Sequence, residues 1–308
     1  MGSLFHRDIK IGHNYKTEND LTLFLGDCID LLKQIPDNSV QLVVTSPPYN
    51  IGKEYEKKQN LQNYLNLQEK VIKECYRVLK SEGSICWQTG NYVDNGSIIP
   101  LDILIYPIFD QLKMKMRNRI IWHFGHGLHA SKRFSGRYET IVWFTKSDNY
   151  YFNLDPIRVP QKYPSKKHFK GDKKGEFSCN PLGKNPSDIW DIPNVKNNHI
   201  EKTEHPCQFP VALIERLVLS MTREDDLVFD PYMGVGTTAI AALLHRRKSA
   251  GADVVKKYLD IAKERIKLLS DGQLKTRPMN QLIYKPKEDY QSNIFIKSDD
   301  DIYLTLTN

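Results

Sequence analysis

Several segments that would assign this chain to other protein classes are missing from its sequence. No stretch approaches about 18 consecutive apolar residues, so we expect neither a membrane-spanning helix nor a membrane partner. The N-terminus carries no apolar signal region, as expected of a protein that is not exported. The five cysteines form no CxxC pair and no metal-ligand spacing, so we expect a reducing, cytoplasmic setting and no metal site.

The complete signatures of two common nucleotide-binding loops are also missing. Gly234 and Gly236 lack the third glycine of a GxGxxG fingerprint, and no Gly-Lys-Ser/Thr follows, which argues against a phosphate-binding P-loop. What is present is a chain of 308 residues, 40% of them hydrophobic, which suffices for one large α/β domain with a smaller insertion. The net charge of +7 points only weakly to nucleic acid.

A rigid turn follows the apolar run Val40–Val44. Residues 45–49 read Thr-Ser-Pro-Pro-Tyr, and the two prolines fix φ and remove two backbone donors. The turn therefore offers carbonyl acceptors, a hydroxyl and an aromatic face at the carboxyl end of a buried parallel strand, where open α/β sheets hold their ligands. This arrangement suits a flat, amino-bearing ring. An ordinary loop is the alternative.

A second motif lies far away, in residues 227–238. They read Leu-Val-Phe-Asp-Pro-Tyr-Met-Gly-Val-Gly-Thr-Thr and predict a strand, a glycine turn and a helix. Glycines let the backbone approach a ligand closely. Asp230, at the tip of the strand, can accept from a ligand's amino group.

Two further carboxylates end predicted strands. Asp253 stands about 20 residues beyond the glycine turn, where an acidic residue typically holds ribose hydroxyls. Alternatively, it caps a helix over Lys256–Leu269. Asp27 follows the strand Leu21–Leu25 and either caps the helix that begins near Cys28 or accepts from an adenine amino group.

The remaining pattern alternates strands with helices. This alternation predicts an α/β fold with a doubly wound, mostly parallel sheet. The polar stretch 51–65 is interpreted as a mobile flap, or else as a surface excursion. The other expected elements are helices over 66–80 and Pro210–Ser220 and strands over Ser84–Gln88, Ile120–Phe124 and Thr140–Phe144.

Basic residues gather in two irregular stretches between the motifs, over Arg158–Lys174 and over His126–Arg137. Basic, aromatic, helix-poor segments can cross a phosphate backbone and reach bases, although a solvated loop is the alternative. The candidate DNA-binding side chains are Lys132, Arg133, Arg137, Lys162, Lys166, Lys167 and Lys170.

The two motifs together resemble those of the DNA amino-methyltransferases that use S-adenosylmethionine. Ser46, Pro47, Pro48 and Tyr49 look like the family's catalytic tetrapeptide. Because this tetrapeptide precedes the cofactor motif, the order is similar to that of the permuted β group. The resemblance covers roughly residues 20–150 and 200–270. It implies a cofactor set of Asp27, His205, Pro206, Asp230, Pro231, Tyr232, Gly234, Gly236, Thr237, Thr238 and Asp253.

The resemblance also implies an organisation and a set of partners. We expect a circularly permuted, Rossmann-like catalytic and cofactor-binding domain over 1–122 and 201–272, an inserted target-recognition region over 123–200, and a tail over 273–308 of unknown role. Double-stranded DNA is the expected partner. The family further allows a homodimer and a cognate restriction endonuclease that acts on the same site.

The implied chemistry is methyl transfer to the exocyclic amine of a base flipped out of the duplex. Ser46 Oγ and the Pro47 carbonyl would accept hydrogen bonds from the amine, and Tyr49 would stack on the ring. The Ser that opens the tetrapeptide points to cytosine-N4, whereas Trp122–Lys146, Asn149–Asn153 and Asp188–Pro193 look more like adenine-N6 enzymes. We lean to adenine.

Alternatives from other classes remain at this stage. Pro206-Cys207-Gln208 also occurs in cytosine-C5 enzymes, but there it follows the cofactor turn, so we assign Cys207 no catalytic role. The other candidates are a nucleotide-binding oxidoreductase, a catalytically inactive DNA-binding relative, and a methyltransferase for RNA or protein.

Overall fold

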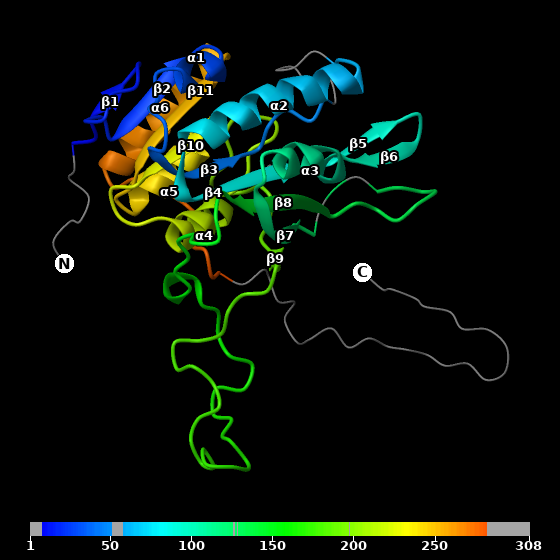
Figure 1. Cartoon of the computed structure of the whole chain (residues 1–308), viewed down its shortest axis with the longest axis vertical. Coiled ribbons are helices and arrows are strands. Elements are labelled where there is room, and N and C mark those ends of the chain that lie inside the picture. The colour runs from blue at the N-terminus through cyan, green and yellow to red at the C-terminus, as the bar shows by residue number, and fades with distance from the viewer. Residues whose placement is uncertain (1–7, 51–57, 126, 128, 197, 282–308) are drawn as a thin grey trace.

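A nine-stranded sheet forms the centre of the computed structural model (Figure 1). The structure describes residues 8–50, 58–125, 127, 129–196 and 198–281. The strands follow the order β1-β2-β11-β10-β3-β4-β8-β7-β9, and all neighbours are parallel except for the antiparallel pairs β4–β8 and β8–β7. Their bounds are β1 Ile11–Gly12, β2 Leu21–Leu25, β3 Val40–Thr45, β4 Leu79–Thr89, β7 Lys115–His123, β8 Tyr138–Thr145, β9 Ile189–Asp191, β10 Leu227–Asp230 and β11 Lys248–Asp253.

Helices cover both faces of this sheet (Figure 1). Helices α1 (Cys28–Leu32), α2 (Leu61–Val78) and α3 (Leu101–Gln111) pack on one face. Helices α4 (Val211–Met221), α5 (Thr237–Leu244) and α6 (Lys256–Ser270) pack on the other. Side chains of β3 alternate between the two cores: Val43 joins the first, while Leu42 and Val44 join the second. Since both faces are buried, β3 is apolar on both, as a central parallel strand requires.

The strand order changes direction between β10 and β3. From β3 the chain runs through α2 to β4 on one side, and from β10 it runs through α5 to β11 on the other side. The connections therefore diverge on opposite faces and leave a crevice at the carboxyl ends of the two strands. This confirms the expected doubly wound, mostly parallel sheet and brings the two sequence motifs side by side.

The structure also corrects parts of the expected element pattern. Helix α2 already begins at Leu61, because the Asn60 side chain caps it by accepting from the Asn63 amide at 2.8 Å. The prediction of a flap was therefore wrong for residues 61–65, while 51–57 lie outside the described residues. Features that were not foreseen include α3, the short edge strands β1 and β9, and the hairpin of β5 (Asn91–Asp94) with β6 (Ser97–Pro100).

One part of the expected target-recognition region belongs to the sheet, and another part projects from it. Strands β8 and β9 belong to the sheet, whereas residues 158–188 form a long irregular excursion that projects away from it (Figure 1). The domain boundaries stay a prediction. The tail beyond 281 lies outside the described residues.

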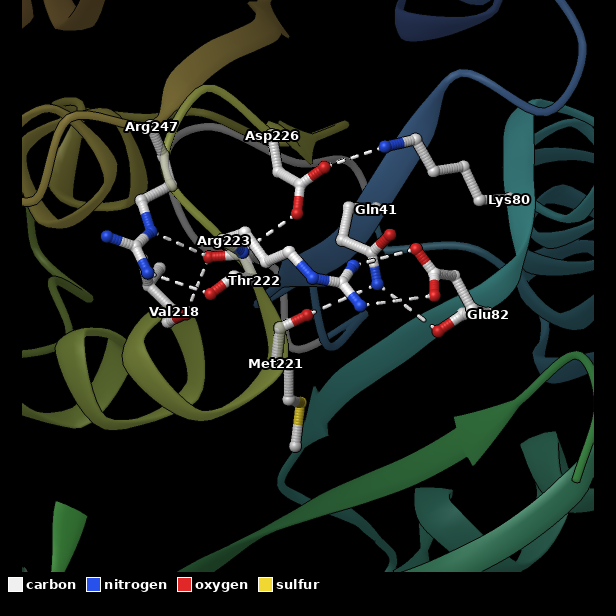
Figure 2. Close-up of polar contacts among 9 residues, drawn as sticks. All are labelled: Gln41, Lys80, Glu82, Val218, Met221, Thr222, Arg223, Asp226 and Arg247. Atoms are coloured by element: carbon white, nitrogen blue, oxygen red, sulfur yellow. Dashed lines mark hydrogen bonds and ion pairs between the residues drawn. The ribbon is translucent and has the colours of Figure 1, made fainter. Parts of the chain in front are cut away.

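A cluster of polar contacts closes the amino-terminal edge of the sheet, opposite the crevice (Figure 2). Arg247 Nε donates to Thr222 Oγ1 at 2.9 Å, and its Nη2 donates to the Thr222 carbonyl at 2.7 Å. Lys80 Nζ donates to Asp226 Oδ1 at 2.6 Å, and Arg223 pairs with Glu82 at 2.8 Å. These contacts tie the end of α4 to the starts of β10, β11 and β4.

The described residues allow two checks, one for a membrane-spanning helix and one for the state of the cysteines. Across the parts of the chain that the structure describes, no helix is long and apolar enough to cross a membrane. All five cysteines lie in these parts and are free thiols.

Candidate active site

A cavity of about 750 Å³ opens at the carboxyl edge of the sheet, at the crevice between β10 and β3. Its size matches sites for small ligands and cofactors. Its walls come from the segments after β2, β3, β10 and β11, from the first half of α2, and from residues 205–209. The predicted site residues that line it are Asp27, Ser46, Pro47, Pro48, Tyr49, His205, Pro231, Tyr232, Gly234, Thr237 and Asp253.

The glycine turn after β10 depends on left-handed backbone. Gly234 has φ +51° and Gly236 has φ +77°, values that side chains rarely tolerate. A Cβ on Gly236 would also lie 2.9 Å from Ala262 Cβ in α6. The turn consequently brings bare backbone to the cavity wall.

Asp253 orders this turn from the neighbouring strand. Its Oδ2 accepts from the Gly234 amide at 2.9 Å, and its Oδ1 accepts from the Val255 amide, just before α6, at 2.8 Å. Burial raises the pKa of this carboxyl, while both hydrogen bonds lower it. The capping interpretation of Asp253 was wrong, because Val255 is the N-cap of α6 and no side chain caps this helix. The carboxylate instead orders the backbone before α6 and lines the cavity, and its contact with ribose stays a prediction. Asp27 likewise lines the cavity while it caps α1, by accepting from the Ile29 amide at 2.8 Å.

Asp230 has a different role from the predicted one. Its carboxylate is fully buried behind the cavity wall and accepts from Thr45 Oγ1 and Thr238 Oγ1, both at 2.6 Å, and from the Tyr232 amide at 3.0 Å. Burial raises its pKa to about 6, against the opposing effect of these donors. The expectation that Asp230 takes a ligand's amino group was wrong, because its acceptor positions already hold β3, the glycine turn and α5 together.

Other predicted cofactor residues also lie behind the wall. Thr238 uses its hydroxyl on Asp230, and neither Pro206 nor Gly236 is among the described residues that line the cavity. Thr238 and Gly236 thus shape the turn from behind the wall, and the cofactor-side role of Pro206 stays a prediction.

The tetrapeptide carries a polar network that the sequence did not suggest. The Tyr49 hydroxyl donates to Glu139 Oε2 at 3.1 Å and lies 3.1 Å from Ser46 Oγ. Gln88 Nε2 donates to both members of the pair, to Tyr49 at 3.2 Å and to Glu139 at 2.5 Å. Because the single Tyr49 proton goes to Glu139, Ser46 donates to Tyr49 and keeps its own lone pairs available.

The ring of Tyr49 rests on backbone. A Cβ added to Gly90 would lie 2.9 Å from Tyr49 Cε2, so the ring packs directly against this glycine. Burial raises the pKa of Tyr49 well above its ordinary value, and nearby Glu139 adds to the rise. Burial raises the pKa of Glu139 as well. Tyr49 is therefore a fixed, neutral aromatic wall.

His205 faces the glycine turn from the opposite wall. Its Nε2 would lie 3.5 Å from a Cβ on Gly234, and its ring meets Tyr258 at 4.5 Å between centroids. Burial and Lys202 lower its pKa to about 4, so the ring is neutral near pH 7. Since Nδ1 accepts from the Cys207 amide at 3.2 Å, the proton is on Nε2. Cys207 lines the same wall, and its lack of a catalytic role stays a prediction.

The seven candidate DNA-binding residues lie outside the cavity. Lys132, Arg133 and Arg137 precede β8, and Arg137 lies two residues before Glu139 in the sequence. Lys162, Lys166, Lys167 and Lys170 are exposed on the excursion. The sequence therefore predicted many of the residues that line the cavity, while the DNA-binding role of the basic residues stays a prediction. It missed Gln88 and Glu139, which contact Tyr49, and Gln68, which lines the cavity.

Comparison with known proteins agrees with this geometry. The chain belongs to the DNA methylase family of adenine-N6 and cytosine-N4 amino-methyltransferases, which use S-adenosylmethionine, because the model of this family matches residues 40–264. It is 57% identical over 241 residues to the type II methyltransferase M.BglII of Bacillus subtilis, covering 78% of this chain and 67% of that protein.

Two further comparisons extend this result. The DNA adenine methyltransferase YhdJ of Escherichia coli K12 is 32% identical over 256 residues, covering 81% of this chain and 83% of YhdJ. The crystal structure of the DNA modification methylase TTHA0409 of Thermus thermophilus, complexed with S-adenosyl-L-methionine, superposes with a TM-score of 0.58. It is 28% identical and covers 81% of this chain and 94% of that one.

Proposed function

We propose that the cavity carries out methyl transfer to the exocyclic amine of a base that has been flipped out of duplex DNA. One observation carries the proposal: the Ser46–Tyr49 turn and the Gly234 turn with Asp253 line the same cavity from adjacent strands. A base bound at the first turn and a cofactor bound at the second then lie next to each other.

The residues at the second turn fit S-adenosylmethionine. Bare backbone at Gly234 admits close approach of the ligand, and the Asp253 carboxylate can accept from ribose hydroxyls. The neutral His205 beside this turn adds no positive charge that would repel a sulfonium. When bound, this cofactor supplies an electrophilic methyl carbon.

The residues at the first turn position the acceptor amine. An exocyclic amine is a weak nucleophile because its lone pair is delocalised into the ring. Ser46 Oγ, with its lone pairs available, and the Pro47 carbonyl accept from the two amino protons and favour a tetrahedral nitrogen. Tyr49, fixed by Glu139, Gln88 and Gly90, holds the ring by stacking. Catalysis here consists of positioning and electrostatics, without a general base of matched pKa.

Cytosine-N4 is proposed as the first candidate for the methylated position, in place of the adenine-N6 that the sequence favoured. Ser46, the residue that points to cytosine, lines the cavity, whereas the three segments that look like adenine enzymes lie outside its lining. Adenine-N6 is the second candidate, supported by the 32% identity to a DNA adenine methyltransferase.

One experiment tests the activity and the base together. Plasmid DNA is methylated with labelled S-adenosylmethionine and digested, and its nucleosides are identified by mass spectrometry. We expect N4-methylcytosine, and N6-methyladenine would select the second candidate. Label on RNA or protein instead of DNA would contradict the proposal. Tyr49→Ala should abolish transfer while calorimetry still detects cofactor binding, and full activity of this variant would remove the stacking role.

The basic stretches are proposed to bind the DNA. Residues 129–137 lead directly into Glu139, so this loop reaches the duplex beside the extruded base, and the excursion over 158–188 contacts the duplex farther away. The type II methyltransferases among its relatives support a cognate endonuclease that acts on the same site. Resistance of the methylated plasmid to endonucleases of known site would identify the sequence. Analytical ultracentrifugation tests for the homodimer.

A further inference from the structure

Gln68 is a polar residue on the buried face of α2. The other residues on this face are Tyr64, Val71, Ile72, Cys75 and Val78. Gln68 is 3% exposed and lines the active-site cavity. Its Oε1 is buried without a hydrogen-bond partner among the residues that the structure describes. Such a carbonyl costs folding free energy unless something else satisfies it.

The position of Gln68 relates it to both halves of the cavity. Tyr64, one turn before it, packs with Tyr49 of the catalytic turn. Val71, almost one turn after it, belongs to the same hydrophobic cluster as Cys28 of α1 and Tyr232 of the glycine turn. Gln68 thus lies at the cavity wall, on the helix that packs between the two turns.

We propose that the Gln68 amide binds the edge of an amino-substituted heteroaromatic ring in this cavity. Oε1 accepts from the ring's amino group while Nε2 donates to the adjacent ring nitrogen. Adenine and cytosine both present an amine beside a ring nitrogen, and a glutamine amide matches such a pair with two hydrogen bonds. The ring belongs either to the adenine of the cofactor or to the flipped base. The inference rests on the proposed function, because that function places both rings in this cavity.

The test exploits the opposite effects of one substitution on folding and on binding. Gln68→Leu and Gln68→Met remove both amide atoms at similar volume. Because Oε1 is buried without a partner in the free protein, both variants should keep or raise the melting temperature. Binding of the ring should weaken about tenfold or more. Gln62→Leu, at an exposed position of the same helix, is the matched control and should change neither quantity.

Two binding measurements distinguish the sources of the ring. The first compares S-adenosylhomocysteine with S-inosylhomocysteine, which lacks the amine, by calorimetry without DNA. If the wild-type protein prefers S-adenosylhomocysteine and both Gln68 variants lose this preference, the ring belongs to the cofactor. The second compares duplexes in which the methylated base is retained or replaced by its deaminated form. If the Gln68 variants lose the wild-type preference only in this second measurement, the ring belongs to the flipped base.

Two results would overturn the inference. One is wild-type affinity and ring preference of Gln68→Leu and Gln68→Met in both measurements. The other is a fall of several degrees in the melting temperature of both variants, which would mean that the amide serves the fold. Failure of the proposed function would give a different result, because the wild-type protein would then bind S-adenosylhomocysteine but would not methylate DNA.

Discussion

The hydroxyl of Tyr49 donates to the carboxylate of Glu139 across 3.1 Å, although 90 residues separate them in the chain. Tyr49 follows the central strand β3, whereas Glu139 lies in β8, two strands away. Gln88, from the strand between them, donates to both. Glu139 therefore acts as a positioning residue that fixes the aromatic wall of the site.

Glu139→Ala should lower kcat by about 10- to 100-fold, since Tyr49 loses its acceptor and the buried Gln88 amide loses a partner. Cofactor affinity should stay unchanged, because Glu139 lies outside the cavity lining. Single-turnover rates and calorimetry measure the two quantities. Glu139→Gln should retain more activity because its amide still accepts from Tyr49. Equal loss in both variants, or a matching loss of cofactor affinity, would contradict a positioning role.

Asp253→Asn should weaken cofactor binding about tenfold or more. The amide can accept from the Gly234 and Val255 backbone less well than two carboxylate oxygens do, and it no longer carries charge toward ribose hydroxyls. Titration with S-adenosylhomocysteine provides the measurement. Asp260→Asn, in α6 outside the cavity lining and paired with Lys256 at 2.6 Å, serves as the comparison and should bind normally. An Asp253 variant that binds as tightly as wild type would leave Asp253 only the role of ordering the backbone at Gly234 and Val255.

Titration of His205 should lower the stability of the fold as the pH drops from about 6.5 to about 4. Its pKa is about 4 in the folded protein, so in this range the unfolded chain binds a proton that the folded chain does not. The stabilisation is present above pH 6.5 and is lost toward pH 4. Asp230 acts with the opposite sign, because its pKa is raised to about 6. The free energy of unfolding of wild type and of His205→Asn is therefore measured in urea at several pH values. The difference between the two proteins isolates the effect of His205. A constant difference would refute the shifted pKa.

The excursion should supply electrostatic contacts to DNA. Replacing Lys166, Lys167 and Lys170 together by Ala should lower the slope of log K against log salt by about 0.9 for each lysine that contacts a phosphate. Fluorescence anisotropy at several salt concentrations measures this slope. Lys73→Ala, on the outer side of α2 and paired with Glu69, should leave it unchanged. A triple variant with the wild-type slope would mean that the excursion lies away from the duplex.

Arg247→Ala should destabilise the fold by about 1–3 kcal/mol without changing kcat or KM. The guanidinium donates to the Thr222 carbonyl and hydroxyl at the amino edge of the sheet (Figure 2), and Arg247 does not line the cavity. Urea unfolding and steady-state rates test the two parts. The neighbouring Arg246→Ala removes only an exposed pair with Glu224 at 3.8 Å and should cost little. Altered kinetics in Arg247→Ala would indicate coupling between the two sheet edges.

Much of the fold and of the site was predictable from local pattern. The apolar runs before Ser46 and Asp230 and the glycine turn identified the strands and the edge at which they end, because parallel strands align their carboxyl ends. The polar partners of these residues were not predictable. That Glu139 reaches Tyr49 depends on the antiparallel pairing of β8 with β4, and no local signal fixes that register.

Two other differences have similar causes. Asp230 looks like a free carboxylate in the sequence, and only the packing shows that Thr45 and Thr238 saturate it. Helix α3 was missed because Pro107 stands inside it, where a proline normally argues against a helix.

The carboxylate of Asp230 joins Thr45, the residue before the tetrapeptide, to the start of the cofactor turn and to α5. The donor and acceptor halves of the site thus share a single buried anchor. Their separation is therefore set when the chain folds. For the proposed methyl transfer, we expect delivery of the base and departure of the modified strand to limit the rate, and fidelity to depend on which bases enter a gap of constant width.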